Sequence, residues 1–367
     1  AALLVPLGAV SLTVKSQDIG TADPDLLTRI YPGKAYSPYA EREFATELLF
    51  GETHVHSALS ADAGGGGTRL MPRDVYRFAS GEQLNSNTGQ PVKLARPFDF
   101  FALTEHTDGM GAFTDLLRGA PNLLADEQGK YFYEEFNAGG DRAKAASIEL
   151  IRLFSQGELS DALNYQPGNP GYAATWKDLV SAAEEFNRPG QFTTLIAYEW
   201  TSLVKGNNLH RNVIFRDGPE RALQMLPFTM TPPTGSPDPR DLWKWLAAYE
   251  EKTGGDVLAI PHNPNLSNGM MFALDNFFER GAAFDTDYLA NRARWERLVE
   301  IGQTKGDSES HPTLSPDDEF ADFEEFPFFL QGQYTEYFVK PGDFMRTALK
   351  RGLSLEQQHG ANPYQFG

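Results

Sequence analysis

Short apolar runs, rich in β-branched and aromatic residues, alternate along this chain with segments of helical pattern. The runs that predict strands span residues 48–55, 98–104, 193–200, 209–215, 257–261 and 298–301. The segments that predict helices span residues 72–80, 127–155, 175–186, 239–252 and 288–297. Because strands separated by helices favour parallel pairing with right-handed crossovers, the pattern predicts an α/β fold. The stretch 109–188 is too long for a simple crossover and predicts a helical insertion.

Charge and cysteine content exclude several classes of function. The chain has 367 residues, 50 acidic against 32 basic side chains, and a net charge of −18. That excess of negative charge argues against a nucleic acid polymer as partner, since binding its phosphates requires a surplus of Lys and Arg. Cysteine is absent, so there is no thiolate nucleophile, disulfide, Cys-ligated zinc or iron–sulfur cluster. A transition-metal site here must use imidazole and carboxylate ligands.

The N-terminal residues 1–12 are apolar, interrupted by Pro6, and carry no charge. They are too few for a membrane-spanning helix, which needs about 20 residues, and no other stretch is long and apolar enough, so no integral membrane segment is expected. The run is either the end of a secretory signal peptide or an N-terminal strand. A periplasmic or secreted location is therefore a hypothesis, with a cytoplasmic one as the alternative.

Histidines and acids collect at the ends of the predicted strands. In order along the chain they are His54, His56, Asp62, Glu105, His106, Glu199, His210 and His262. Residues i and i+2 of a strand point to one face, so His54 and His56 can reach one ion. The carboxyl ends of parallel strands share one side of a fold, where chemistry collects. One such histidine is more often structural, but four separate strand ends favour a shared metal site.

Imidazole and carboxylate ligands suit Zn, Mn or Fe(II), and Glu199 could bridge two ions about 3.5–4 Å apart. Two ions sharing a water lower its pKa and supply hydroxide near neutral pH, which attacks phosphorus or a carbonyl carbon. The glycine run 64–67 lacks the Gly-Lys-Ser/Thr of a phosphate-binding loop. The residues therefore predict a metal-dependent hydrolase that uses a metal-bridged hydroxide as nucleophile.

Four ordered motifs resemble the PHP (polymerase and histidinol phosphatase) superfamily. They are Thr53-His54-Val55-His56 with Asp62, Leu103-Thr104-Glu105-His106, Glu199 with His210 eleven positions later, and Pro261-His262-Asn263. The resemblance extends from about residue 48 to 367. It is closest to a secreted branch known only as a domain of unknown function.

This resemblance implies a distorted (βα)7 TIM-like barrel over 48–367, after an N-terminal extension at 1–47, with insertions at about 109–190 and 264–335. It implies a phosphoesterase with two or three divalent ions (Zn, Mn or Fe). The residues at ligand positions are His54, His56, Asp62, His106, Glu199, His210 and His262. Glu105 replaces the family's commoner Asp and is expected to support the ligands or to act in acid–base catalysis, with His210 also counted as catalytic.

The sequence departs from the PHP pattern in one respect, because the late Asp-x-His that completes the family's site does not occur in it. We therefore expect that the last barrel strand is missing from these residues or that one ion has fewer protein ligands. The segment 300–309 resembles a substrate-facing loop of the same branch, and an ordinary turn is the alternative.

Several cations flank the expected ligands and could orient a small anionic substrate such as a phosphate ester. They are Arg69, Arg73, Lys205, Arg211 and Lys305. Arg211 is the preferred one and is counted as catalytic, although strand alternation directs it away from His210.

Two other functions compete with the phosphoesterase. An amidohydrolase-like enzyme that cleaves C–N or C–O bonds also begins with His-x-His, but it typically bridges its ions with a carboxylated lysine. Here Glu199 ends the middle strand and no lysine ends a comparable one, which favours the phosphoesterase. A metal-binding protein without catalysis is the third possibility.

Overall fold

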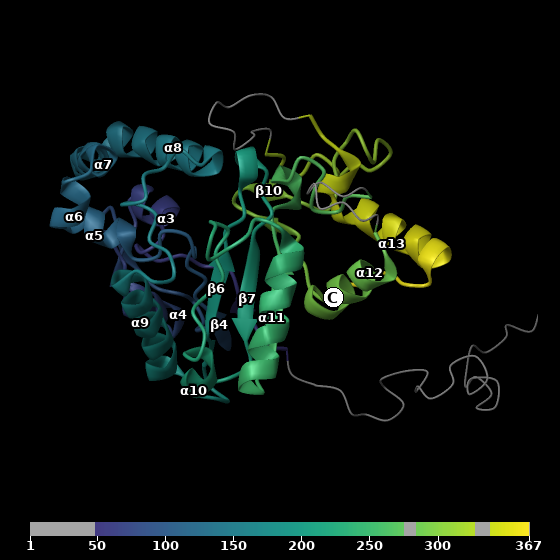
Figure 1. Ribbon diagram of the computed structural model, residues 1–367, viewed down its shortest axis with the longest axis horizontal. Coiled ribbons are helices and arrows are strands. Elements are labelled where there is room, and N and C mark those ends of the chain that lie inside the picture. The colour runs from purple at the N-terminus through teal and green to yellow at the C-terminus, as the bar shows by residue number, and fades with distance from the viewer. Residues whose placement is uncertain (1–47, 275–283, 327–337, 367) are drawn as a thin grey trace, which may run out of the picture. The chain divides into compact units, whose positions relative to one another are not determined.

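The computed structural model describes residues 48–274, 284–326 and 338–366 (Figure 1). The chain divides into two units, Ala1–Leu48 and Leu49–Gly367, and every element below belongs to the second unit. The strands are short, which leaves much of the fold to helices and connecting loops.

Two three-stranded sheets share one continuous segment of chain. The first contains β1 (Gly51–Glu52), β4 (Phe100–Ala102) and β5 (Thr193–Leu195), all parallel, in the order β1-β4-β5. The second contains β6 (Ala197–Trp200), β7 (Arg211–Phe215) and β8 (Val257–Pro261), in the order β6-β7-β8. Because β5 and β6 are separated only by Ile196, the segment 193–200 joins the two sheets.

The second sheet corrects the prediction of parallel pairing, since β7 pairs antiparallel with both β6 and β8. The connection 216–238 first returns the chain to the end of the sheet where β6 finishes, as the hydrogen bond from Ser202 Oγ to Pro237 O shows. Helix α11 (Pro239–Thr253) then runs back beside the sheet (Figure 1), so that β8 starts where β7 ends. A helix preceded by such a return loop produces an antiparallel pair.

The remaining strands form two antiparallel pairs, β2 (Leu84–Asn85) with β3 (Pro91–Val92) and β9 (Gly302–Gln303) with β10 (Gly306–Asp307). The prediction of a strand over residues 298–301 is wrong, because that segment is irregular and about half of Ile301 is exposed to solvent. It nevertheless lies beside β8, since Glu300 N donates to Pro261 O.

The five predicted helices are confirmed, with changes in their bounds. They correspond to α4 (Pro72–Ala79), α7 (Glu127–Ala138) with α8 (Gly140–Gln156), α9 (Pro170–Phe186), α11 and α12 (Thr286–Trp295). The stretch predicted as one helix divides into α7 and α8 at Gly139, whose φ of 70° only glycine adopts readily. The Asp238 side chain caps α11 by accepting from Arg240 N.

The other helices are α3 (Ala61–Gly65), α5 (Ala112–Arg118), α6 (Pro121–Leu124), α10 (Pro219–Ala222), α13 (Met345–His359), and the 3-10 turns η1 (Val204–Gly206), η2 (Pro264–Leu266) and η3 (Pro341–Asp343). Helices α5 to α9 form the predicted insertion. The fold class is therefore α/β, and none of the sheets among the described residues closes into a barrel.

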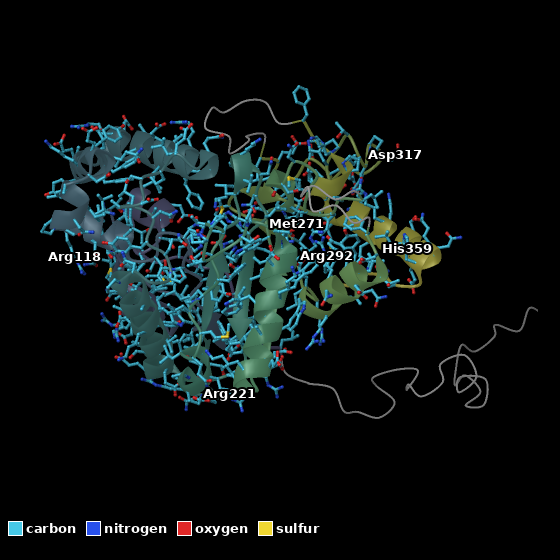
Figure 2. The ribbon with its side chains drawn as sticks, in the orientation of Figure 1. Arg118, Arg221, Met271, Arg292, Asp317 and His359 are labelled. Atoms are coloured by element: carbon cyan, nitrogen blue, oxygen red, sulfur yellow. The ribbon has the colours of Figure 1, made fainter. Side chains whose placement is uncertain are left out.

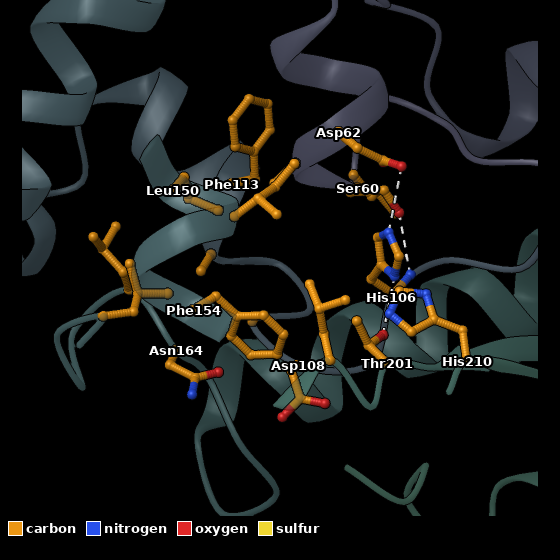
Figure 3. A pocket seen from close by; sticks show the side chains of 18 of the residues that line it. Ser60, Asp62, His106, Asp108, Phe113, Leu150, Phe154, Asn164, Thr201 and His210 are labelled. Atoms are coloured by element: carbon orange, nitrogen blue, oxygen red, sulfur yellow. Dashed lines mark hydrogen bonds and ion pairs between the residues drawn. The ribbon is translucent and has the colours of Figure 1, made fainter. Parts of the chain in front are cut away.

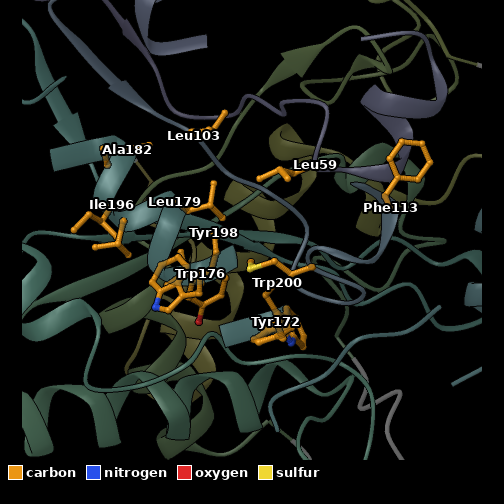
Figure 4. Close-up of a cluster of buried hydrophobic side chains, with 14 of the residues drawn as sticks. Leu59, Leu103, Phe113, Tyr172, Trp176, Leu179, Ala182, Ile196, Tyr198 and Trp200 are labelled. Carbon is orange, nitrogen blue, oxygen red and sulfur yellow. The ribbon is translucent and has the colours of Figure 1, made fainter. Parts of the chain in front are cut away.

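The main core lies between the sheets and the helices that cover them. Trp176 of α9 packs against Tyr198 (Figure 4) and also against Phe215, which Tyr249 of α11 contacts as well. A smaller cluster contains Met271 (Figure 2) and Phe272 together with Met345, Ala348 and Leu355 of α13. Within the described ranges, no helix has the length and apolarity that crossing a bilayer requires.

Candidate metal centre

Glu199 lies at the centre of a cluster of histidine side chains. It is the third residue of β6 and only 1% of it is exposed. Its Oε1 atom is 2.6 Å from His210 Nδ1 and 2.7 Å from His262 Nε2. His210 directly precedes β7 and His262 directly follows β8, so the antiparallel register of these strands carries both imidazoles to the end of the sheet where β6 finishes.

The other oxygen of Glu199 faces three more imidazoles. Glu199 Oε2 is 2.7 Å from His56 Nε2, 3.1 Å from His106 Nδ1 and 3.9 Å from His54 Nε2. A single buried carboxylate is thus in contact with histidines from four separate stretches of the chain.

Asp62 forms a second acidic point of the cluster. It lies in the first turn of α3, and its carboxylate is 3.0 Å from His56 Nδ1 and 3.4 Å from His106 Nε2 (Figure 3). Lys305 Nζ is 3.8 Å from the same carboxylate. His56 and His106 therefore each lie between two carboxylates, Asp62 on one side and Glu199 on the other.

Glu300 is a third acidic point, and the sequence analysis did not identify it as a ligand. Its Oε2 is 2.7 Å from His54 Nδ1, and its Oε1 accepts from Gln303 Nε2. The sequence does contain a signal for this role, because Glu300 lies near the end of an apolar run, as Glu105 and Glu199 do. The resemblance of segment 300–309 to a substrate-facing loop does not single out Glu300 as a ligand.

Backbone hydrogen bonds continue the strand pairing beyond the ends of β1 and β4, and this places the histidines. Thr104 N donates to Val55 O, Thr107 N donates to Glu199 O and Glu199 N donates to Glu105 O. In addition, the side-chain amide Nδ2 of Asn212, on β7, donates to Thr53 O. These bonds hold the His54–His56 segment, the end of β4 and the end of β6 side by side.

Glu105 does not belong to the cluster itself. One oxygen accepts from Ser57 N and the other from Ser60 Oγ, and Ser60 Oγ in turn accepts from His106 N. The buried carboxylate thus ties the turn after His56 to the residue that carries the next imidazole. This placement fits the expectation that Glu105 supports the ligands, while a part in acid–base catalysis stays a prediction.

Burial and close charges shift the pKa values across the cluster. Burial alone would raise the pKa of Glu199, but the surrounding histidines, His106 first, hold it well below its ordinary value. Burial would lower the pKa of His56, but Asp62 and Glu199 raise it well above its ordinary value. Burial lowers the pKa of His210 to about 3 and that of His262 to about 4. Those two imidazoles are therefore neutral at pH 7, which is the form that binds metal.

The donor set fits divalent metal ions. Three groups of side chains each bring their ligand atoms within 4.8 Å of one another: His54, His56 and Glu199; His56, Asp62 and His106; and His106, Glu199 and His210. In addition, His210 Nε2 and His262 Nδ1 are buried and have no hydrogen-bond partner among the described residues. Nitrogen and carboxylate donors at this density suit Zn, Mn or Fe(II).

The structure thus brings together the seven side chains predicted as ligands. Metal binding by these side chains stays a prediction. The other two histidines lie elsewhere, His311 near Glu325 and His359 at the exposed end of α13 (Figure 2).

The substrate-orienting role predicted for Arg211 does not fit its position. Arg211 is 1% exposed, its Nε is 3.0 Å from Glu296 Oε1, and its guanidinium also donates to Leu209 O. Alternation along β7 directs it into the body of the protein, on the side opposite His210. Arg211 is a buried structural cation.

The other flanking cations divide between surface and site. Arg73 pairs with Asp178 and Glu185 at the surface, and Arg69 donates to backbone carbonyls at residues 64 and 68. Lys205 is exposed on η1. Among the five cations predicted from the sequence, Lys305 is the one that the structure places against a candidate ligand, Asp62.

Comparison with known proteins gives a family but no function. Residues 43–367 match the family model described as "Protein of unknown function (DUF3604)", and the chain belongs to this family. No curated protein and no solved structure matches the chain.

Proposed function

We propose that this member of the DUF3604 family is a metal-dependent hydrolase and, within that class, a phosphoesterase. The observation that carries the proposal is the contact of five imidazoles with one buried carboxylate, with Asp62 and Glu300 on its two sides. One buried carboxylate can be satisfied by far fewer than five histidines, so hydrogen bonding alone does not explain this arrangement. Binding of more than one divalent cation would explain it, because each cation needs several imidazole and carboxylate ligands.

The ligands would lie on two sides of Glu199. Glu199 itself would be shared between the two sides, because its two oxygens face different histidines. His54 and Glu300 lie on one side of it and His106 with Asp62 on the other. Divalent ions bound here would lower the pKa of a water molecule bound to them to about 7. They would also stabilise the negative charge that develops on the substrate during hydrolysis.

Lys305 supports a phosphate ester over an uncharged substrate. Its side chain is one-third exposed, and its ammonium group lies at the edge of the cluster, near Asp62. With divalent cations held by Asp62, this lysine would be available to contact an anionic group of the substrate. The amidohydrolase-like alternative lacks comparable support, because the position between the two halves of the cluster is held by Glu199 and not by a lysine.

We also propose that the strands form part of a distorted barrel related to the PHP superfamily. The order β1-β4-β5/β6-β7-β8 continues through segment 298–301, whose Glu300 bonds to the end of β8 and whose side chain reaches His54 after β1. These contacts support a ring of chain around the site. The short strands and the antiparallel β7 would be its distortions.

Metal content and turnover, measured together, test the proposed function. The metal-loaded parent is expected to release p-nitrophenol from bis-p-nitrophenyl phosphate or p-nitrophenyl phosphate with Mn or Zn added, and to be far slower with a carboxyl ester. His54→Ala is expected to lose both metal and turnover. His359→Ala is the matched control, because this exposed histidine lies at the end of α13, and it should retain both.

Two outcomes would contradict the proposal. Turnover of the carboxyl ester without turnover of either phosphate ester would favour the C–O hydrolase. Full metal occupancy with no turnover of any of the three would favour a metal-binding protein without catalysis.

A further inference from the structure

A largely apolar cavity of about 130 Å³ lies beside the cluster, on the side of His106 and His210. Asp62, His106 and His210 border one end of it, and Lys305 lines it as well. Figure 3 shows Asp62, His106 and His210 on one side and Phe113, Leu150 and Phe154 on the other. Asn164 and Asp108 lie beside Phe154 and add polar groups to the lining there. The cavity is thus continuous with the candidate metal centre and not a separate void in the core.

The helical insertion builds the apolar wall of this cavity. Helix α5 contributes Phe113, and helix α8 contributes Leu150, Ile151 and Phe154. Phe154 lies four residues after Leu150 and three after Ile151, the two spacings at which side chains are neighbours on a helix surface. Each of them is only partly buried, because the face they share borders the cavity. The insertion therefore supplies a specific apolar surface next to the site.

A second cavity, of about 780 Å³, borders the opposite side of the cluster. It is lined by His54, His56 and Glu300 together with polar groups of segment 302–305. Asp62 and Lys305 line both cavities, so the cluster lies between two spaces, of which the one walled by α5 and α8 is the more apolar. A molecule whose reacting group is held at the cluster would extend one substituent into each space.

We propose that the substrate is an ester bearing one apolar substituent of about the size of a single aromatic ring, which occupies the cavity walled by α5 and α8. This inference rests on the proposed function for the reacting group. The size follows from the volume, since an apolar protein cavity of about 150 Å³ holds one benzene molecule. Polar substituents would lose their hydrogen bonds to water among the leucine and phenylalanine side chains.

Binding of two non-hydrolysable phosphonates tests this inference. Phenylphosphonate and methylphosphonate carry the same anionic group and differ in the apolar substituent. For the Mn-loaded parent, titration calorimetry is expected to show about 10- to 100-fold tighter binding of phenylphosphonate, because one buried ring adds about that factor. Equal affinity for the two phosphonates would overturn the inference.

Two leucines of α8 provide matched variants. Leu150 lines the cavity, whereas Leu153 lies on the same helix and borders a different hollow, beside Tyr131. Leu150→Asn is expected to reduce the preference for phenylphosphonate by at least about 5-fold, as the loss of one apolar contact surface predicts. Leu153→Asn should leave the preference unchanged. An equal reduction in both variants would show a general effect on the helix and would refute the assignment.

Turnover of phenyl phosphate and methyl phosphate separates this inference from the proposed function. If neither ester is hydrolysed but phenylphosphonate binds more tightly, the hydrolase is wrong and the apolar subsite stands. If both are hydrolysed equally and both phosphonates bind equally, the hydrolase stands and the subsite is wrong.

Discussion

Replacing Glu199 by glutamine removes the central charge of the cluster and hardly changes the size of the side chain. Its contacts with His210, His262 and His56 are 2.6–2.7 Å long, and a hydrogen bond to a charged group contributes about 1.5–3 kcal/mol. The cost of burying a carboxylate, several kcal/mol, offsets part of that gain. We therefore expect the metal-free variant to lose about 2–4 kcal/mol of the free energy of unfolding.

The decisive quantity is the change in stability that metal produces. At a free metal concentration of 100 times Kd, binding adds about 2.7 kcal/mol to the free energy of unfolding, and the variant should gain little of this. Urea unfolding, followed by tryptophan fluorescence with and without Mn, measures both terms. Glu296→Gln is the control, because this glutamate is equally buried but pairs with Arg211 away from the cluster. The reasoning is refuted if Glu199→Gln keeps the metal-dependent gain or if Glu296→Gln loses it.

Three further predictions follow from individual contacts. Glu300→Gln should weaken metal binding by about 10- to 100-fold, the range typical of groups that support or extend a ligand set, and an unchanged Kd in metal titration would contradict this. Glu105→Gln should lower the free energy of unfolding by about 1–3 kcal/mol, because Ser57 N and Ser60 Oγ lose a charged acceptor, while bound metal per chain stays at the parental value in elemental analysis. Arg211→Met should lower the free energy of unfolding by about 3 kcal/mol without changing KM. Burial alone would raise the pKa of Glu296, but Arg211 and Arg292 lower it below its ordinary value. The stability that this ionised acid contributes is therefore present above its unfolded pKa, near 4.5, and is lost as the pH falls through the lower folded pKa. Parent and Arg211→Met should therefore converge in urea unfolding as the pH falls from about 4.5 through the lower pKa that Glu296 has in the folded parent, and a difference that stays constant into strong acid would contradict the pairing.

The helices were the most predictable part of the fold, because their signals are local. Asp238 and Pro239 mark the start of α11 and Gly254 its end, and the structure has the helix between them. The register of the strands was less accessible. The antiparallel pairing of β7 with β8 depends on where the loop 216–238 leads the chain, and no local pattern encodes that path.

The candidate ligands were predictable for a related reason. A histidine or acid that ends an apolar run is visible in the sequence, and the geometry of sheets brings such ends to one side. Arg211 shows the limit of this reasoning. Its neighbour His210 faces the cluster. Because successive side chains of a strand point to opposite faces, the Arg211 guanidinium points into the protein interior, where it pairs with Glu296 from a distant segment.

Sequence alone therefore determined which side chains are available for chemistry: histidines and carboxylates without cysteine, placed at the tips of apolar runs. Tertiary structure decided where they lie. It brought five imidazoles into contact with Glu199, placed Glu300 beside His54, paired Arg211 with Glu296 away from the cluster, and set an apolar cavity from α5 and α8 beside the cluster. The physical reason is that the identity of a donor atom is local, whereas the distance between donors depends on contacts between residues that are far apart in the chain.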